Sequence, residues 1–513
     1  MLERIDLRRA AAGLVVTLGA IASSPSHAQE NILRVPYLSD IGSFDPDNAF
    51  EVGGLGSVNA VYEGLVEYVP GSTEIVGLLA DSWEVSPDEM TYTFDLADGV
   101  TFHDGKPMTA DEVLASFKRR KDNDLVLSYF LWNVVDMSAP DPDTFVIKLG
   151  MPQPSFLDTL ASPWGPKVVS PGALVDHAGD DNATGYLNDN AIGTGPFKLA
   201  KFARGEEIVL EKFADYHGAA PYFDRIEIPT VPDIGQELLQ LRSGEIDAVP
   251  VNYPWAQLKA LPPGLEATAI NSMALVMAFV KPGTVMDNPD VRTAVLTAIN
   301  PALWADAAFG KYATVAESLY PIAMLKPDVP VAYPTDMEAA KKAIAAAGDV
   351  SIVIGVPIDE APNVQRVADL MIAQLAEIGV NATAVIIPKD GAYNFASDMS
   401  KAPDIMLARN NPDAAHPETQ ATVFYTKGAP INVMGIADEA ADAVIQEAGT
   451  KTDIAERNAL YEKAGHMYFD AGEFLPLVDL QDVVVHKEGL VDLGLRPVFP
   501  PGNIDFGTVR FAE

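Results

Sequence analysis

The stretch Leu79–Arg119, LADSWEVSPDEMTYTFDLADGVTFHDGKPMTADEVLASFKR, predicts a strand pair, a turn and the start of a helix. Within it, Thr91–Leu96 has the period-two alternation of a strand. Thr109 precedes the helix, and Glu112 three residues later completes a capping box. The stretch contains no catalytic signature, so it indicates a fold and not a reaction.

The rest of the chain mixes strand and helix patterns. A strand, a helix and a second strand are predicted at Ile352–Val356, Val364–Ile378 and Val380–Ile387, an order typical of a parallel α/β unit. A late helix at Asp453–Phe469 is followed by a strand at Val483–His486. About 485 residues follow residue 28, which exceeds one hydrophobic core and predicts two or three domains.

The first 28 residues have the pattern of a cleaved signal peptide. Three arginines precede the apolar run Ala10–Ala22, whose 13 residues fall short of the ~20 that span a bilayer. Ser26-His27-Ala28 places small residues at positions −3 and −1 of a cleavage site. Arg8-Arg9 leaves the twin-arginine export route open beside the general one.

The chain contains no cysteine, which excludes a lipid-modified amino-terminal cysteine, disulfides and thiolate metal sites. We therefore expect export to a bacterial periplasm without a lipid anchor. Without residues 1–28 the formal net charge changes from −37 to −38, and so acidic a chain repels nucleic acid. No histidines are spaced as HxH or HExxH, so we expect no metal site and no cofactor.

Leu79–Arg119 resembles the signature segment of the family 5 extracellular solute-binding proteins, the receptor subunits of ATP-binding-cassette (ABC) importers. Five further parts of the chain resemble this family in the same order. They are Ile192–Leu199 with Phe213–Ile228, Leu238–Val249, Asn288–Asn300, Tyr333–Gly348 and Val367–Val385. The resemblance covers about residues 31 to 510.

This resemblance implies an α/β, two-lobed periplasmic binding protein fold of type II, cluster C, with a subdomain inserted in the first lobe. It places lobe I at residues 29–59, 186–271 and 481–513, the inserted subdomain at 60–185 and lobe II at 272–480. We expect strands that cross a hinge to join the lobes. The implied partners are a small-molecule ligand and an inner-membrane ABC permease, and we expect a monomer.

The loop Arg409–Pro417, RNNPDAAHP, holds the main candidate ligand contacts. In peptide-binding members this loop resembles Trp-x-x-Asp-x-x-Asp-Pro, and its first Asp pairs with the peptide ammonium group. Counting back from the proline gives that role to Asp413, which also has the context of a turn residue. Asn410 stands where the family has Trp, which removes a stacking surface. His416 stands at the second acidic position and adds a group that titrates near neutral pH.

Other candidate contacts come from residue type or position. Arg409 suits a ligand carboxylate, with a structural salt bridge as the alternative, and the Asn410-Asn411 pair suits polar ligands. Trp132 suits an aromatic wall or, alternatively, the core of the inserted subdomain. Position alone suggests two further sets of contacts: Phe44 follows the first strand, and Asn252, Tyr253 and Trp255 follow a turn near the expected hinge.

The sequence therefore favours a substrate-binding receptor for a peptide or peptide-like molecule. An opine-type sugar conjugate or oligosaccharide and a nickel chelate are alternative ligands. A periplasmic amide hydrolase on a two-lobed scaffold is the rival from another class, but the sequence shows no nucleophile with its base and orienting group. A sensory receptor without a transporter shares the expected fold.

Overall fold

The computed structural model describes residues 30–39, 41–50, 53–251, 253–358, 363–388, 395, 398–498 and 502–512. The predicted signal peptide and the candidate residue Asn252 lie outside these ranges. Within them, no helix combines the length and the apolar character needed to cross a membrane.

Lobe I is built on a four-stranded sheet with the order β1–β10–β9–β8. The first two strands pair in parallel and the others are antiparallel. The strands are β1 (Ile32–Arg34), β8 (Phe197–Ala203), β9 (Glu207–Lys212) and β10 (Arg225–Pro229). Beside this sheet lie α1 (Leu55–Val61), α6 (Ile234–Ser243), β11 (Ala248–Val249), β18 (Leu490–Val491) and β19 (Arg510–Phe511). Two short helices, α4 (Pro171–Leu174) and α5 (Thr184–Leu187), fall at the end of the range predicted for the inserted subdomain, but Ala173 and Leu187 belong to the same hydrophobic cluster as Leu33 of β1.

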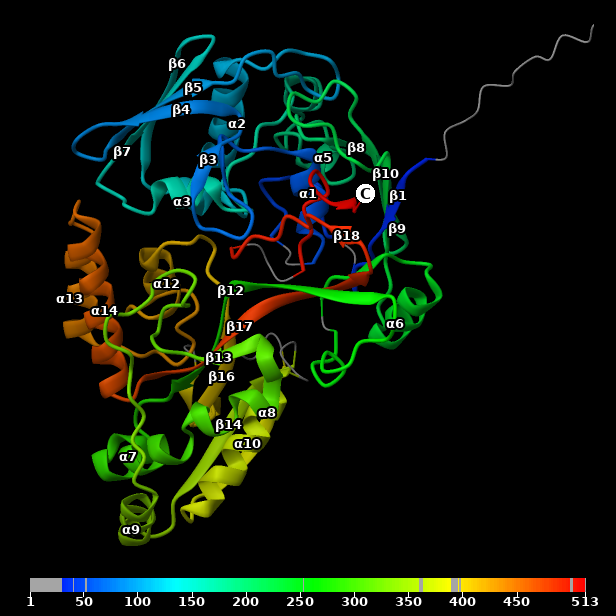
Figure 1. The fold of residues 1–513 in the computed structure, drawn as a ribbon. Coiled ribbons are helices and arrows are strands. Elements are labelled where there is room, and N and C mark those ends of the chain that lie inside the picture. The colour runs from blue at the N-terminus through cyan, green and yellow to red at the C-terminus, as the bar shows by residue number, and fades with distance from the viewer. Residues whose placement is uncertain are drawn as a thin grey trace, which may run out of the picture.

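The inserted subdomain contains an antiparallel sheet with the order β4–β5–β7–β6. The predicted capping box is confirmed: Thr109 and Glu112 exchange side-chain-to-backbone bonds at the start of α2. The elements are β2 (Val66–Tyr68), β3 (Ile75–Gly77), β4 (Ala80–Val85), β5 (Thr91–Leu96), α2 (Ala110–Asp122), η1 (Ser128–Leu131), β6 (Val134–Asp141), β7 (Thr144–Leu149) and α3 (Phe156–Ala161). In Figure 1 this subdomain lies above α12–α14 of lobe II.

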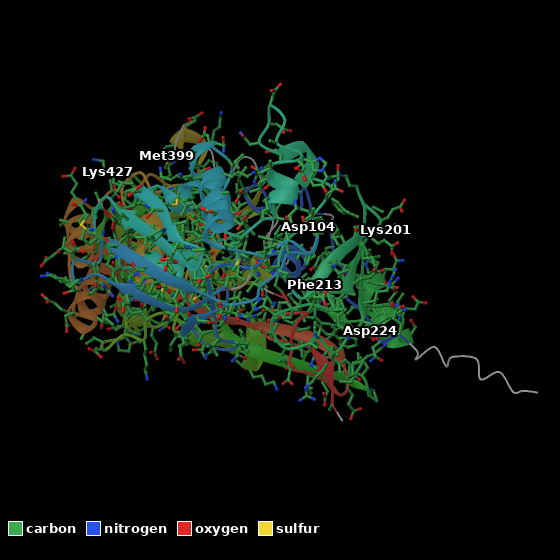
Figure 2. All side chains as sticks on the ribbon, turned by 90° about the horizontal axis from the view of Figure 1, so that it is seen from above. Asp104, Lys201, Phe213, Asp224, Met399 and Lys427 are labelled. Carbon is green, nitrogen blue, oxygen red and sulfur yellow. The ribbon has the colours of Figure 1, made fainter. Side chains whose placement is uncertain are left out.

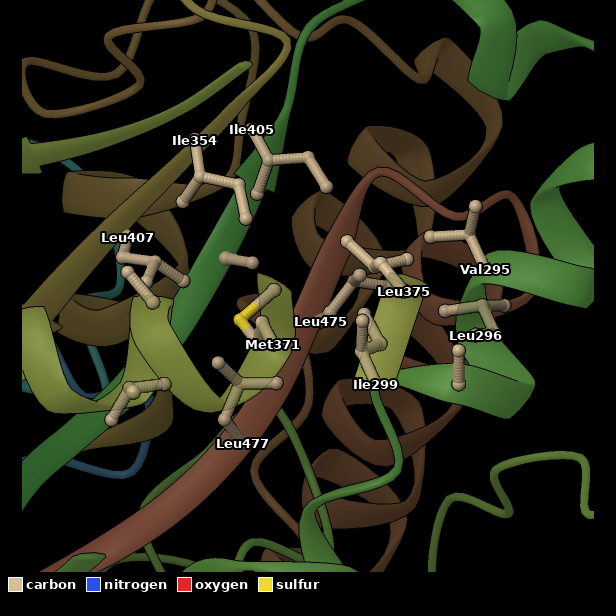
Figure 3. Packing of buried hydrophobic residues seen from close by; sticks show 14 of the residues in the cluster. Val295, Leu296, Ile299, Ile354, Met371, Leu375, Ile405, Leu407, Leu475 and Leu477 are labelled. Carbon is tan, nitrogen blue, oxygen red and sulfur yellow. The ribbon is translucent and has the colours of Figure 1, made fainter. Parts of the chain in front are cut away.

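Lobe II contains the predicted parallel unit, which is confirmed: β14 and β15 pair in parallel, with α10 between them in sequence. Figure 3 shows Met371 and Leu375 of α10 packed among Leu407, Leu475 and Leu477, which are all fully buried. The elements are η2 (Val285–Asp287), α7 (Pro289–Ala298), η3 (Pro301–Leu303), α8 (Ala305–Phe309), η4 (Gly310–Tyr312), β13 (Ala313–Val315), α9 (Met337–Ala347), β14 (Ser351–Pro357), α10 (Asn363–Glu377), β15 (Asn381–Ile387), η6 (Met399–Lys401), β16 (Ile405–Asn410), α12 (Pro417–Phe424), α13 (Glu439–Ala448) and α14 (Ile454–Asp470).

Two long antiparallel strands, β12 (Leu265–Val280) and β17 (Phe474–Lys487), run from lobe I into lobe II (Figure 1). Their register shifts between Asn271 and Leu275, so the ladder is interrupted where a hinge is expected. The short strand predicted at Val483–His486 is the end of β17. Alternation missed the rest of this strand because Phe474–Leu480 is buried on both faces.

The surface carries many charged groups, as the acidic composition predicts. Figure 2 shows Lys201, Asp224 and Lys427 at the periphery, where each takes part in an exposed or half-exposed ion pair. Such pairs contribute at most about 1 kcal/mol each to stability. The hydrophobic clusters of the two lobes therefore supply most of the stabilisation.

Candidate functional site

A cavity of about 230 Å³ lies between the loops of lobe I and the two hinge strands. Its lining includes Tyr37, Tyr253, Trp255, Arg409, Asp482 and Gly502. Three of these, Tyr253, Trp255 and Arg409, were predicted as ligand contacts. Aromatic walls with a few convergent polar groups are typical of small-molecule sites.

Tyr253 and Trp255 form the aromatic side of this hinge cavity. Tyr253 is buried, and its hydroxyl has no hydrogen-bond partner among the described residues. The Trp255 ring meets Phe309 edge-on at 5.5 Å between centroids and also contacts Tyr312. An unsatisfied buried hydroxyl is costly, so a ligand or water that bonded Tyr253 would be stabilised there.

Arg409 and Asp482 supply opposite charges to the hinge cavity. Both carboxylate oxygens of Asp482 accept from the backbone N–H of Gly502, at 3.0 and 2.9 Å. Burial raises the pKa of Asp482 to about 6, and the Gly502 N–H and the Arg409 charge oppose this rise. Gly502 has φ +82°, and a Cβ there would lie 2.2 Å from the Pro250 carbonyl oxygen, so glycine is needed for this approach. The positive charge of Arg409, which also lines the cavity, therefore partly balances Asp482.

Asp413 lies where the inserted subdomain meets lobe II. The Tyr129 hydroxyl donates to Asp413 Oδ2 at 2.7 Å, and Ser162 Oγ donates to the Asp413 carbonyl oxygen at 2.5 Å. Burial raises the pKa of Asp413, and the bond from Tyr129 opposes this rise. The Tyr129 and Asp413 oxygens can accept from one ammonium group. Sequence reasoning missed Tyr129, although it lies three residues before the candidate Trp132.

The family model of the bacterial extracellular solute-binding proteins, family 5 Middle, matches residues 74–432. The chain belongs to this family. This match confirms the predicted family, whose members are binding proteins. Among the described residues, no group of three or more His, Cys, Asp or Glu is arranged to hold a metal ion.

Individual relatives support the same assignment. The chain is 34% identical over 239 residues to the Probable D,D-dipeptide-binding periplasmic protein DdpA of Escherichia coli, a match that spans 45% of each chain. It is 26% identical over 495 residues to the glutathione-binding protein GsiB of Salmonella typhimurium, covering 93% of this chain and 94% of that protein. The periplasmic binding protein DppA of Helicobacter pylori, solved with the peptide STSA, matches with a TM-score of 0.77 at 24% identity, covering 94% and 99%. This structural match confirms the predicted α/β two-lobed fold.

The prediction that His416 titrates near neutral pH in this family 5 protein is wrong. His416 is buried at the start of α12, where its Nδ1 accepts from the Glu418 N–H at 3.1 Å. Burial lowers the pKa of His416 to about 3, and the nearby positive charge of Arg457 adds to the effect. His416 is therefore neutral between pH 5.5 and 7.5 and acts as a helix cap.

Phe44 is a core residue in this structure, contrary to the prediction that it lines the binding crevice. It is 0% exposed and meets Phe202 edge-on at 5.1 Å between ring centroids. Its loop is fastened to α2 because Asp45 accepts two bonds from Arg119, at 2.8 and 2.7 Å. The loop's acidic residues thus hold the inserted subdomain on lobe I and do not face the hinge cavity.

The structure places the remaining candidate contacts, Asn410, Asn411 and Trp132, in three different environments. Asn410 is 2% exposed, and its Nδ2 lies 2.6 Å from Met277 Sδ, so it faces the core and not the hinge cavity. Asn411 Oδ1 is buried without a partner among the described residues, which leaves it able to accept a bond from a ligand. Trp132 is 63% exposed, so it packs neither in the core nor against the hinge cavity.

Proposed function

We propose that this protein is the periplasmic substrate-binding receptor of an ABC importer. It captures a peptide or peptide-like molecule between its two lobes and delivers it to an inner-membrane permease. The observation that carries the proposal is the Asp413–Tyr129 pair, which brings two ammonium acceptors from opposite sides of the lobe contact within 2.7 Å. The relatives DdpA and GsiB, whose names state a dipeptide and glutathione, support this ligand class.

The ligand lies between Asp413 and the hinge cavity. Its ammonium group bonds Asp413 and Tyr129, and its carboxylate faces Arg409. Arg409 and Asp413 are four residues apart, so their Cα atoms are separated by at most about 14 Å. An extended peptide of up to about four residues spans that distance. The favoured substrate class is therefore a short peptide with free termini.

Binding stabilises the closed arrangement because the ligand contacts both sides of the cleft at once. A ligand changes the balance between open and closed forms only through contacts that differ between them. The Tyr129 contact comes from the inserted subdomain and the Asp413 contact from lobe II, so both are complete only when the lobes meet. Water excluded on closure strengthens the two charge-assisted contacts.

A thermal-shift screen of residues 29–513 tests this function. The probes are trialanine, N-acetyl-trialanine, trialanine amide, maltotriose and nickel–histidine. At 100 times the dissociation constant a ligand adds about 2.7 kcal/mol of stability, which moves the unfolding midpoint visibly. We expect a shift with trialanine that acetylation abolishes. A shift with maltotriose or nickel–histidine alone would overturn the peptide assignment, and release of amines from trialanine would indicate the hydrolase instead.

A further inference from the structure

A chain of hydrogen bonds links the inserted subdomain to the loop at residues 411–416. The backbone N–H of Ala415 donates to Tyr68 Oη at 3.0 Å. Tyr68 Oη lies 3.0 Å from Asp158 Oδ1 and 3.1 Å from the Asp158 carbonyl oxygen. Tyr68 is fully buried at the end of β2, and Asp158 belongs to α3. A side chain of the inserted subdomain thus holds the backbone of the loop that carries Asp413.

We propose that Tyr68 and Asp158 form a proton-dependent latch, which holds the inserted subdomain on lobe II and positions the loop at residues 411–416. The proposal rests on the proposed function, because that loop carries the expected ammonium contact. The latch bonds involve the loop backbone, so they form whether or not a ligand is bound. Tyr68 and Asp158 are positioning residues in this arrangement.

The proton dependence follows from the environment of Asp158 in the closed form. Burial raises the pKa of Asp158 to about 7, while the bond from Tyr68 opposes the rise. When the lobes separate, water reaches Asp158 and its pKa returns toward the usual value near 3.9. The closed form therefore binds the proton more tightly, and lowering the pH favours closure. A carboxyl group protonated at Oδ2 still accepts from Tyr68 at Oδ1, so the latch bond is kept.

The groups that face Asp158 come from three further elements. Glu418 of α12 has a raised pKa because of burial, and its Oε2 accepts from the Ser155 N–H at 3.2 Å. Its negative charge raises the pKa of Asp158, whereas the positive charge of Arg457 in α14 lowers both. Tyr92 of β5 has a pKa raised by burial and stays neutral. Glu418 and Asp158 therefore respond to pH in the same direction.

Two groups in the loop itself border the same contact. The pKa of Asp413 is raised by burial, so its protonation also favours the closed form. His416, whose pKa is lowered to about 3, keeps its charge state across the range from pH 6 to 8. Acidification in that range thus removes negative charge from the lobe contact without adding positive charge.

The absence of cysteine allows the latch to be measured with two introduced labels and no ligand. Glu84→Cys on β4 and Glu439→Cys on α13 are exposed positions in the inserted subdomain and lobe II. Single-molecule energy transfer between the labels resolves open and closed populations. With a pKa of about 7 for Asp158 in the closed form, the closed-to-open ratio rises about tenfold from pH 8 to pH 6.

Three variants complete the experiment. Asp158→Asn is neutral at every pH, so its population ratio should change much less than tenfold between pH 6 and 8. Tyr68→Phe keeps the ring but loses the bonds to Ala415 and Asp158, so its closed fraction at pH 6 should fall. Asp88→Asn, at the exposed tip of the β4–β5 hairpin, should keep the wild-type response.

A population ratio that does not change with pH in the labelled protein would overturn the latch, whether or not the variants fold. So would an Asp158→Asn ratio that follows pH as the wild type does. Because no ligand enters this measurement, failure to bind peptides leaves its result intact. Peptide binding with an unchanged ratio would reject only the latch.

Discussion

The Tyr129 hydroxyl of the inserted subdomain donates to Asp413 Oδ2 of lobe II across 2.7 Å. This bond joins two segments separated by 284 residues in sequence, and Asp413 lies in the connection between β16 and α12, because Arg409 and Asn410, predicted as part of this loop, belong to the end of β16. An ammonium group bonded to both oxygens would cross-link the lobes. The inserted subdomain therefore contributes directly to the proposed ligand contacts.

Asp413→Asn should weaken binding of trialanine at least tenfold, about 1.4 kcal/mol, because it removes one charged contact. Tyr129→Phe should weaken it about fivefold, since a neutral hydrogen bond contributes about 1 kcal/mol. Isothermal titration calorimetry measures both effects. Trialanine amide, which keeps the ammonium group, should lose affinity to the same extent, and unchanged binding of either ligand would show that Asp413 does not contact an ammonium group.

Arg409→Gln should weaken binding of trialanine about tenfold and leave trialanine amide nearly unchanged, because only the acid carries a carboxylate. The same titration applied to both ligands gives the comparison. Arg366→Gln is the matched control, since Arg366 is exposed and bonds the Ala307 carbonyl oxygen of lobe II. If both ligands lose affinity equally, Arg409 acts through its balance with Asp482 and not through the ligand.

His416→Ala should reduce the free energy of unfolding by about 1 kcal/mol, because α12 loses its cap. His416→Asn should retain most of that stability, since asparagine also caps helices well. Because burial lowers the pKa of His416 to about 3 in the folded protein while the unfolded chain keeps a value near 6.5, His416 makes stability rise by about 1.4 kcal/mol from pH 5.5 to 7.5, and both substitutions should remove that rise. Urea unfolding at several pH values measures this, and a pH slope that both variants retain would mean that His416 titrates alike in the folded and unfolded protein.

Local patterns predicted much of the fold. The capping box at Thr109 and the parallel unit at Ile352–Ile387 depend on neighbouring residues, so periodicity and capping rules detect them. β17 was mostly missed because its first half is buried on both faces, which removes the alternation that identifies a strand.

The candidate site was predicted less completely because its groups meet only through tertiary contacts. Tyr253, Trp255 and Arg409 line one cavity as expected, but Asp482 and Gly502 reach it from the end of the chain. Phe44 was misplaced because a position after the first strand does not reveal that Asp45 pairs with Arg119. No local pattern shows such a pair, since the two residues are 74 positions apart.

Glu237 in α6 is a buried acid that makes the folded protein less stable as the pH rises toward 8. It is 0% exposed, and neither carboxylate oxygen has a hydrogen-bond partner among the described residues. Burial raises its pKa to about 8, and the negative charge of Asp233 adds to the rise. Because the pKa is higher in the folded than in the unfolded protein, deprotonation of Glu237 favours unfolding. The free energy of unfolding is therefore unaffected by Glu237 below about pH 4.5 and falls as the pH rises to 8.

Glu237→Gln should therefore unfold with a free energy about 1–3 kcal/mol higher than the wild type at pH 8, with a smaller difference at pH 5. Urea unfolding at both pH values gives the difference, which isolates Glu237 from other carboxyl groups that titrate in this range. Glu245→Gln is the matched control because Glu245 is exposed in the turn after the same helix. A Glu237→Gln difference that is the same at both pH values would mean that Glu237 is hydrated or paired in solution.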